Sequence, residues 1–324
     1  MISDKILHEE LQRTLDQTEF TFGKKYEGKV RDNYTVGDRR VIITTDRISA
    51  FDRVLGSIPF KGQVLNALSN FWFEKTKHIV PNHIIEIPDP NVVIVKECEP
   101  LPVEMVVRGY ITGVTKTSAW YNYQQGVRNF CGNRLPEGLK KDQQFKTPIL
   151  TPSTKAEKGG HDESVSREEI LKRKLMAAEV FDAIAAYSME LYRFGVRLCA
   201  KQGIILVDTK YEFGLDASGG VILFDEIHTP DSSRFWHADT YEKLFKGGKE
   251  QRKIDKEYVR KWLADIGYLG DGEPPLIPDE VRIEAARRYI DAYEKITGMA
   301  FRPALGTDPA VRIEHCLKKA GYIR

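Results

Sequence analysis

The segment from residue 204 to residue 214 constrains the fold of this chain more than any other. It begins as the apolar run Ile204–Val207, which is typical of a buried strand, and then places Asp208, Lys210 and Glu212 at alternate positions. Because successive side chains of a strand point to opposite faces, these three ionisable groups share one face. Unpaired charges are costly to bury. The face is therefore either open to solvent or the lining of a charged site.

A second predicted strand, Val221–Phe224, follows a glycine-containing turn and ends in further carboxylates. If Asp216 pairs with the first residue of that strand across a four-residue loop, Glu212 lies opposite Asp225 and both carboxylates can reach one ion. A five-residue loop would instead put Asp225 opposite Tyr211, on the other face. We expect the first register. It would provide oxygen ligands of the kind that Mg²⁺ prefers, together with nucleotide phosphates.

Cationic side chains occur at three further places. Gly28 lets a ligand approach the backbone closely, and Lys29 and Arg31 are expected to project to one face of a strand. Arg108 follows a predicted strand and Arg234 lies in a hydroxyl-rich loop, where a guanidinium can bind phosphate or carboxylate in a forked geometry. Taken singly, each of these segments is more often exposed surface charge or a surface ion-pair partner.

The pattern of strands and helices predicts an α+β fold of two lobes. A β-rich amino-terminal lobe is expected over residues 1–100, and a larger α+β lobe, containing the charged hairpin and carboxy-terminal helices, over residues 101–324. The expected strands are Tyr26–Tyr34 and Arg40–Thr45 around a turn at Gly37, then Val92–Val95 and Met105–Val107. The expected helices are Asn66–Thr76, one long helix from a capping box at Ser166 to about Leu198, Asp279–Thr297, and one starting at Pro309. Residues 131–165 are expected to be a long loop region.

Composition excludes several classes of protein. Hydrophobic residues are 41% and charged residues 30% of the 324, a soluble globular profile, and the net charge is only +2. Acids and bases alternate without the basic stripe of a nucleic-acid binder, and no apolar run approaches the ~20 residues that span a bilayer. The amino terminus lacks the apolar region of a signal peptide. The four cysteines, Cys98, Cys131, Cys199 and Cys316, are widely spaced. These features predict a cytoplasmic protein with free thiols.

Several segments, taken together, resemble the phosphoribosylaminoimidazole-succinocarboxamide synthase (SAICAR synthetase) family in its longer-chain form. They lie in collinear order between about residues 20 and 240: Gly28–Asp32, Asp46–Asp52, Pro102–Gly109, Thr151–Lys155 with Gly160–Glu163, Leu206–Gly214, Asp225-Glu226 and Pro230–Trp236. One segment departs from the family pattern. Where the family often has Thr-Gly-Ser-Ala-Trp, this chain has the longer Thr112–Trp120. The position of the family's serine therefore falls either to Ser118 or to a nearby threonine.

The resemblance implies an ATP-dependent ligase of de novo purine biosynthesis. Such an enzyme joins L-aspartate to the carboxylate of 5-amino-4-carboxyimidazole ribonucleotide through an acyl phosphate, and releases ADP and phosphate. The implied partners are these small molecules, with ATP and Mg²⁺ required, and neither nucleic acid nor membrane. The oligomeric state is left open.

The resemblance also implies roles for particular residues. For ATP these are Lys29, Arg31 and Lys210 at the phosphates, Lys96 as a weaker contact, and the backbone of Glu104 and Met105 at the adenine. Glu212 and Asp225 would bind the metal. Arg108, Ser118 and Arg234 would bind the ribonucleotide phosphate, and Lys155 and Asp162 would border the aspartate or carboxylate pocket. Lys210 and Asp208 would be catalytic.

Two other functions remain open at the level of the residues. An ATP-dependent kinase of a small alcohol would use the same lysines and carboxylates, although the chain lacks the His-Arg-Asp and Asp-Phe-Gly motifs of protein kinases. A nucleic-acid-binding protein is the third possibility, and no interleaving of aromatic and basic residues supports it.

Overall fold

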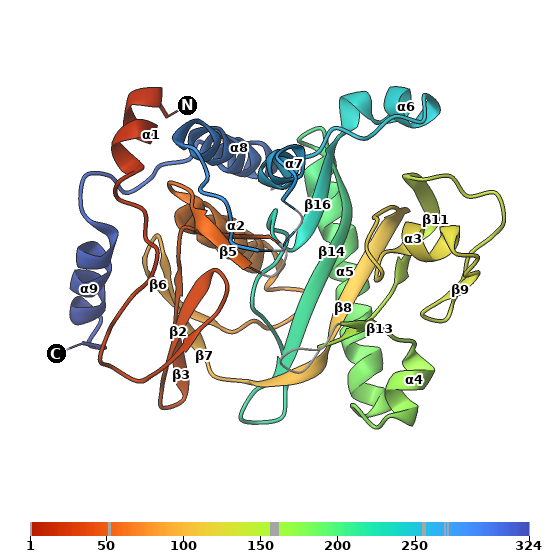
Figure 1. Ribbon diagram of the computed structural model, residues 1–324. Helices are drawn as coiled ribbons and strands as arrows, with labels where there is room; N and C mark the ends of the chain where they lie inside the picture. The colour runs from red at the N-terminus through yellow and green to blue at the C-terminus, as the bar shows by residue number, and fades with distance from the viewer. Residues whose placement is uncertain are drawn as a thin grey trace. The chain divides into compact units, whose positions relative to one another are not determined.

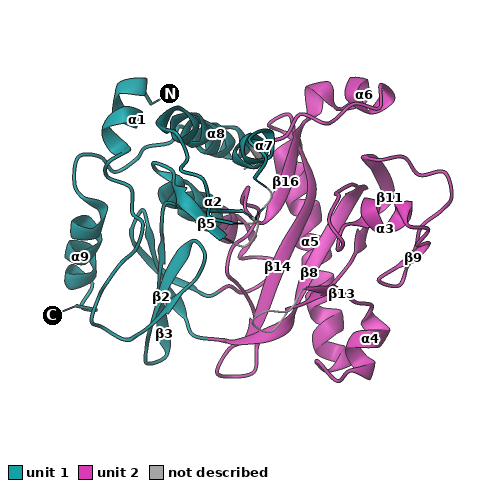
Figure 2. Cartoon of the chain, in the orientation of Figure 1, with its two compact units in different colours: residues 1–71, 83–97, 255–324 teal, residues 72–82, 98–254 magenta. Residues whose placement is uncertain are grey.

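The computed structural model describes residues 2–50, 53–155, 162–254, 257–268, 270 and 272–323 (Figure 1). Four residues of the motifs above, Phe51, Asp52, Gly160 and His161, lie outside the described residues. The chain divides into two compact units, coloured separately in Figure 2: unit 1 comprises residues 1–71, 83–97 and 255–324, and unit 2 comprises residues 72–82 and 98–254. The predicted lobe boundary near residue 100 falls close to one change of unit. Residues 255–324, however, cluster with unit 1 instead of continuing the second lobe.

Unit 1 is built on an antiparallel five-stranded sheet in the order β1-β2-β3-β7-β6. The strands are β1 (Lys24–Glu27), β2 (Arg31–Val36), β3 (Arg39–Thr44), β6 (Ile84–Asp89) and β7 (Val92–Lys96). Tyr34, Val41 and Ile94 of the sheet are fully buried in one cluster with Ile313 and Leu317. The last two belong to the carboxy-terminal helix α9 (Pro309–Lys319), so hydrophobic burial explains why the end of the chain groups with its beginning.

The prediction of one strand over Tyr26–Tyr34 is wrong. The Gly28 N–H donates a 2.8 Å hydrogen bond to the Arg31 carbonyl, which closes a tight turn between β1 and β2. Lys29 therefore lies in a turn, Arg31 begins a strand, and the two do not share a strand face. The turn before β3 is confirmed, with Gly37 at a φ of 61°.

The remaining elements of unit 1 are mostly helices. They are α1 (Asp4–Glu10), the paired strands β4 (Arg47–Ala50) and β5 (Arg53–Ser57), α7 (Glu257–Asp265) and α8 (Asp279–Thr297), while α2 (Lys61–Thr76) begins in unit 1 and ends in unit 2. The predicted bounds of α8 are confirmed, and Gly298 ends it in a left-handed conformation. Pro309 lies in the first turn of α9, as predicted, after the capping residue Asp308.

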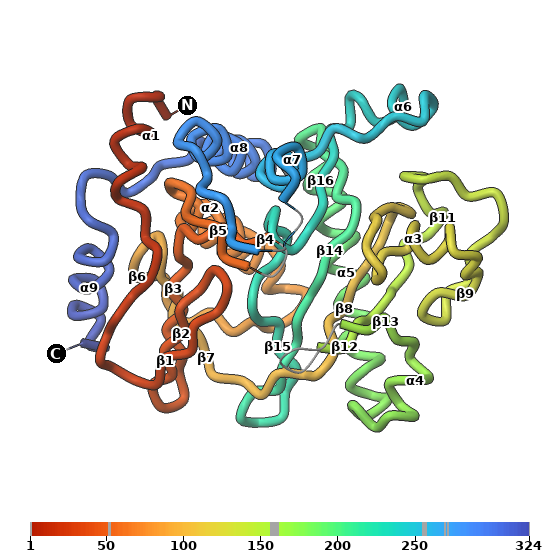
Figure 3. The backbone as a smooth tube through the Cα atoms, viewed as in Figure 1, coloured from red at the N-terminus to blue at the C-terminus, as the bar shows by residue number. Residues whose placement is uncertain are grey.

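Unit 2 contains a seven-stranded antiparallel sheet around two long strands, β8 (Glu99–Ile111) and β14 (Ile204–Leu215). Along the sheet the order is β13-β12-β8-β14-β15, while β11 pairs with β8 and β16 with β14. The shorter strands are β11 (Gln143–Leu150), β12 (Ser153–Thr154), β13 (Glu163–Ser164), β15 (Val221–Phe224) and β16 (Ser233–His237). Figure 3 shows β15 beside β14 and β12 beside β8. The smaller elements are α3 (Ala119–Gln124), α4 (Arg167–Lys172), α6 (Ala238–Lys246) and the pair β9 (Asn129–Phe130) and β10 (Asn133–Arg134).

Helix α5 (Ala178–Ala200) covers one face of this sheet and leaves the other for polar groups. On the covered face Met105, Tyr211 and Phe213 are fully buried. The Tyr192 hydroxyl of α5 donates to the carbonyls of Leu206 and Val207 in β14, at 2.8 and 3.1 Å. The alternation seen in the sequence thus separates an apolar face, packed on α5, from a charged face.

Two predictions for unit 2 need correction. The long helix is two helices, because Lys174 has a φ of 56° and interrupts the helical path between α4 and α5. The capping box at Ser166 and Glu169 is confirmed and begins α4. The predicted loop region contains β11, a polar edge strand whose register shifts between Gln144 and Ile149. Within the described residues, no helix is long and apolar enough to cross a membrane.

Candidate active site

The charged face of the unit 2 sheet is formed by β14 and β8 together. Asp208 pairs with Arg108, and Glu212 pairs with Glu104, in the register of the two strands. Side chains that are directly opposite in an antiparallel pair lie on the same face. The predicted common face of Asp208, Lys210 and Glu212 is therefore confirmed, and β8 adds a carboxylate at one end and a guanidinium at the other.

One end of this face holds a group of lysines and carboxylates that we call the Lys210 cluster: Lys155, Lys210, Glu104, Glu212 and Asp225. The Lys210 Nζ donates to Glu104 Oε1 at 3.1 Å and to Glu212 Oε1, and lies 3.8 Å from Asp225 Oδ2. Lys155 pairs with the other oxygen of Glu212, and its Nζ lies 5.1 Å from the centre of the Phe224 ring. Three carboxylates and two ammonium groups thus meet at one end of the face.

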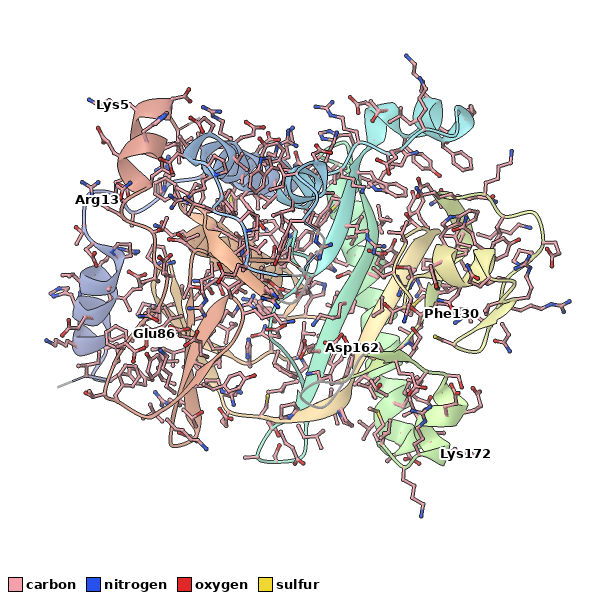
Figure 4. All side chains as sticks on the ribbon, in the orientation of Figure 1. Lys5, Arg13, Glu86, Phe130, Asp162 and Lys172 are labelled. Atoms are coloured by element: carbon pink, nitrogen blue, oxygen red, sulfur yellow. The ribbon has the colours of Figure 1, made fainter. Side chains whose placement is uncertain are left out.

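The electrostatics of this cluster keep its central groups charged. Burial lowers the pKa of Lys210, but Glu212, Asp225 and Glu104 outweigh burial and raise that pKa above its usual value. Burial raises the pKa of Glu212, but Lys210 and Lys155 outweigh it and hold the pKa at about 2. The pKa of Glu104 is raised, first by burial and then by Glu212 and by Asp162 (labelled in Figure 4), against the influence of Lys210. Beside these carboxylates Lys210 is therefore cationic, which suits it to binding phosphate.

The predicted register of the β14–β15 hairpin is wrong. Leu215 pairs with Val221 and Glu212 pairs with Phe224, so the loop has five residues and Asp225 is not opposite Glu212. The reason lies in the turn, where the Asp216 carboxylate accepts hydrogen bonds from the backbone N–H groups of Ser218 and Gly220, both at 2.9 Å. Asp216 is thus part of the turn and not of the strand.

Asp225 nevertheless reaches the charged face. It follows the last residue of β15 and has a φ of 66°, so the strand ends there and its carboxylate points toward Lys210. Among the described residues, no group of three or more histidine, cysteine, aspartate or glutamate side chains is arranged to bind a metal. Glu212 and Asp225 of the Lys210 cluster are nevertheless compatible with Mg²⁺, because this ion is usually held by one or two carboxylates plus substrate phosphates and water.

The other end of the face is positively charged, and we call it the arginine cluster: Arg108, Arg234 and Asp208. Arg234 donates a 2.7 Å hydrogen bond to Asp208 Oδ2, and Arg108 Nη1 lies 3.5 Å from the same oxygen. Arg108 also donates to Thr151 Oγ1 at 2.7 Å and to the Thr117 carbonyl at 2.9 Å. Burial lowers the pKa of Arg108, and Asp208 opposes this. Two guanidinium groups against one carboxylate leave an excess positive charge for an anion.

Ser118 lies next to this cluster, at the start of α3. A Cβ atom placed on Gly113 would lie 2.4 Å from Ser118 Oγ and 3.2 Å from Arg234 Nη1, so both side chains lie against that glycine. Thr115 Oγ1 is 2.7 Å from Ser118 Oγ. The geometry therefore favours Ser118 for the position that the sequence left open, with Thr115 in contact with it.

The other predicted site residues lie in both units. Lys29, Arg31 and Lys96 belong to unit 1, and all the residues of both clusters belong to unit 2. Met105 pairs with Tyr211 within the sheet and its side chain is buried on the α5 face. No role was predicted for Thr151, whose hydroxyl accepts the hydrogen bond from Arg108. Its position at the start of the Thr151–Lys155 motif was the signal that could have identified it.

A charged sheet face with a lysine–carboxylate end and an arginine end suits a particular class of protein, an α+β enzyme that acts on phosphorylated substrates. Comparison with known proteins narrows the class. A family model described as SAICAR synthetase matches residues 24–274. A Legionella pneumophila protein named phosphoribosylaminoimidazole-succinocarboxamide synthase is 50% identical over 288 residues, 89% of this chain and 92% of the relative. A Bacteroides thetaiotaomicron protein of the same name is 46% identical over 310 residues, 93% and 97% of the two chains.

Comparison with solved structures indicates the same family. The SAICAR synthase of Saccharomyces cerevisiae complexed with SAICAR has a TM-score of 0.78 and 32% identity, over 90% of this chain and all of that one. A type-2 SAICAR synthetase in complex with ADP has a TM-score of 0.64 and 25% identity, over 86% of this chain and all of that one. The chain belongs to the SAICAR synthetase family. The predicted α+β fold and the predicted enzyme class, an ATP-dependent ligase of L-aspartate and the carboxylated imidazole ribonucleotide in purine biosynthesis, are confirmed.

Proposed function

We propose that the two charged clusters bind different parts of the ribonucleotide. The arginine cluster binds its phosphate, and the Lys210 cluster lies at its reacting carboxylate. The observation that carries the proposal is the position of the clusters on one strand face. Asp208 and Glu212 are four residues apart on β14, roughly 13 Å at about 3.3 Å per residue. A separation of this size suits a nucleotide held by its phosphate at one end and presenting its carboxylate at the other.

In the reaction we propose, an oxygen of the ribonucleotide carboxylate attacks the γ-phosphorus of ATP, and ADP leaves. The amine of L-aspartate then attacks the carbon of the resulting acyl phosphate, loses a proton, and phosphate leaves as the amide forms. The first step turns a poor electrophile into a good one. Both the phosphoryl transfer and the amide-forming step depend mainly on positioning the reactants and on neutralising charge. Lys210, a cation beside Glu212 and Asp225, supplies positive charge at the transferred phosphoryl group.

Glu212 and Asp225 would hold Mg²⁺, which neutralises phosphate oxygens when bound. In this structure Glu212 is paired with Lys155 and Lys210, so metal binding would release these lysines toward anionic substrate groups. For Lys155 such a group is a carboxylate of L-aspartate, with Asp162 limiting which carboxylates can enter. Asp208 is paired with Arg108 and Arg234, and we propose that it positions them instead of acting in the chemistry itself.

The proposed ATP contacts of Lys29, Arg31 and Lys96, and of the backbone of Glu104 and Met105, rest on the sequence resemblance. The type-2 relative is a complex with ADP and the yeast relative a complex with SAICAR, which supports nucleotide and product binding by this chain. The proposed partners are accordingly small molecules, and the cytoplasmic location stays a prediction.

The test is a coupled assay with the purified protein. ADP release is measured with the ribonucleotide, ATP and Mg²⁺, with and without L-aspartate, and the amide is detected by mass. We expect ADP and the amide only when all components are present. Better turnover with L-glutamate would overturn the amino-acid assignment. A phosphorylated alcohol formed without any amino acid would favour the kinase.

A further inference from the structure

The route by which Asp225 reaches the charged face is unusual for a residue in its position. Phe224 pairs with Glu212 and so lies on the charged face. By alternation the next residue, Asp225, should point to the opposite, apolar face. The left-handed backbone at Asp225 reverses this direction and leaves its carboxylate 3.8 Å from the Lys210 Nζ. Non-glycine residues adopt this conformation rarely, although aspartate does so more often than most, so neighbouring contacts that favour it at Asp225 bear directly on the site.

The side chain that occupies the apolar side is His228, three residues further along. It is fully buried, and its Nε2 lies 2.5 Å from the hydroxyl of Tyr211, a β14 residue of the covered face. Its ring meets Trp72 edge to face, with 4.6 Å between ring centroids. His228 also has a positive φ, of 50°. The short segment from Asp225 to His228 is therefore bracketed by two left-handed residues.

Helix α5 provides the space for this histidine. A Cβ atom on Gly195 would lie 2.5 Å from His228 Cε1, closer than real contacts allow, so only glycine at that position admits the ring. Burial lowers the pKa of His228 to about 3, so the imidazole is neutral and can remain in an apolar environment. The Tyr211 hydroxyl, Gly195 and the Trp72 ring together define one position for the ring.

We propose that His228, anchored by the Tyr211 hydroxyl and admitted by Gly195, is a positioning residue that holds Asp225 in its left-handed conformation and so keeps its carboxylate at the metal site. His228 lies on the side of the sheet that α5 covers and Asp225 points to the other. The histidine therefore acts on the site only through the backbone between them. The inference rests on the proposed function, because it gives Asp225 the role of a metal ligand.

The test uses the full-length enzyme and two conservative variants. Tyr211→Phe removes only the hydroxyl, and Gly195→Ala removes the space for the ring. The matched control is Tyr241→Phe, which removes the hydroxyl of another buried tyrosine of unit 2, one that donates to the Asp142 carbonyl at 3.0 Å. Mn²⁺ binding in the presence of ADP is followed by electron paramagnetic resonance, with the ADP–Mn²⁺ equilibrium measured separately. The Mg²⁺ concentration for half-maximal rate and the KM for the ribonucleotide are measured in parallel.

We expect both variants to weaken Mn²⁺ binding and to raise the half-activating Mg²⁺ concentration about tenfold, a coupling of ordinary size for residues linked through one network of contacts. The KM for the ribonucleotide should change less than about twofold, and Tyr241→Phe should change none of these quantities. If the role of His228 were merely structural, the two variants would have lower melting temperatures, and ribonucleotide binding and metal activation would weaken to the same extent. Equal losses in metal activation and ribonucleotide binding would therefore overturn the proposal.

A double-mutant cycle separates this proposal from the proposed function. If His228 acts through Asp225, Tyr211→Phe should have no further effect on metal activation in an Asp225→Asn background. Additive effects would overturn the positioning role while leaving Asp225 as a ligand. If Asp225→Asn alone leaves Mn²⁺ binding unchanged, the metal assignment fails, and the positioning proposal fails with it.

Discussion

Arg234 donates a 2.7 Å hydrogen bond to the Asp208 carboxylate across the pairing of β16 with β14. Arg108, on the strand at the other side of β14, brings a guanidinium nitrogen within 3.5 Å of the same oxygen. One carboxylate thus holds two guanidinium groups side by side, although their positions in the sequence are 126 residues apart (234 minus 108). Because the pair is preorganised, a phosphate that binds both need not first order two long side chains.

The first prediction concerns this pair. Arg234→Ala should raise the KM for the ribonucleotide at least tenfold, because a charge-assisted hydrogen bond to phosphate contributes about 1.5–3 kcal/mol. The KM for ATP should change less than about twofold. Steady-state kinetics with each substrate varied in turn provide the measurement. Arg193→Ala, at an exposed position of α5, is the control. Small equal changes in both Michaelis constants would mean that Arg234 is ordinary surface charge.

The second prediction concerns the turn between β1 and β2. Lys29→Ala should raise the KM for ATP at least tenfold and leave the KM for the ribonucleotide nearly unchanged, since a lysine in a glycine turn can reach a phosphate without a strand constraint. Lys24→Ala, an exposed lysine of the adjoining strand, is the matched control. If both lysine variants shift the KM for ATP equally, general electrostatic attraction and not a specific contact explains the effect.

The third prediction is a dependence of stability on pH. The pKa of Glu212 is held at about 2 in the folded chain, below its ordinary value of 4.5, because Lys210 and Lys155 outweigh burial. A depressed carboxyl pKa stabilises the fold above pH 4.5, and this stabilisation is lost as the pH falls toward 2. The shift corresponds to about 3 kcal/mol.

Urea unfolding of wild type and Glu212→Gln at pH 7 and pH 3 measures this effect. The difference between the two proteins should be largest at pH 7 and should shrink at pH 3. Glu190→Gln, at an exposed position of α5, should track the wild type at both values. A difference that is constant with pH would show that the carboxylate charge of Glu212 does not stabilise the fold.

The fourth prediction is that the cysteines are reduced and take no part in catalysis. None of the four forms a disulfide within the described residues, and burial raises the pKa of both Cys131 and Cys199 to about 12, which leaves little reactive thiolate. Replacing each in turn, with alanine at the buried Cys199 and serine elsewhere, should retain activity within about twofold. Thiol titration of the native protein should find slow reaction at those two positions. Complete inactivation of any one folded variant would contradict the prediction.

How much of the site could be predicted depends on the range of the interactions involved. The common face of Asp208, Lys210 and Glu212 follows from the geometry of a single strand, and the bounds of α8 follow from local helix signals, so both were predicted correctly. The Lys29 turn was missed, because a hydrogen bond from Gly28 to Arg31 decides between one strand and two. A glycine followed by mixed polar and apolar residues is compatible with either.

The sequence by itself determined which residues carry charge, which face of β14 they occupy and to which family the chain belongs, because each of these depends on local order along the chain. Only the tertiary structure decided which charges meet. The pairing of Lys155 with Glu212 joins residues from separate segments, and the direction of Asp225 depends on a left-handed backbone beside the buried His228. The Asp216 turn sets the register of the β14–β15 hairpin, and packing of His228 against two distant elements, Tyr211 of β14 and helix α5, accounts for the backbone reversal. No periodicity within a single segment records them.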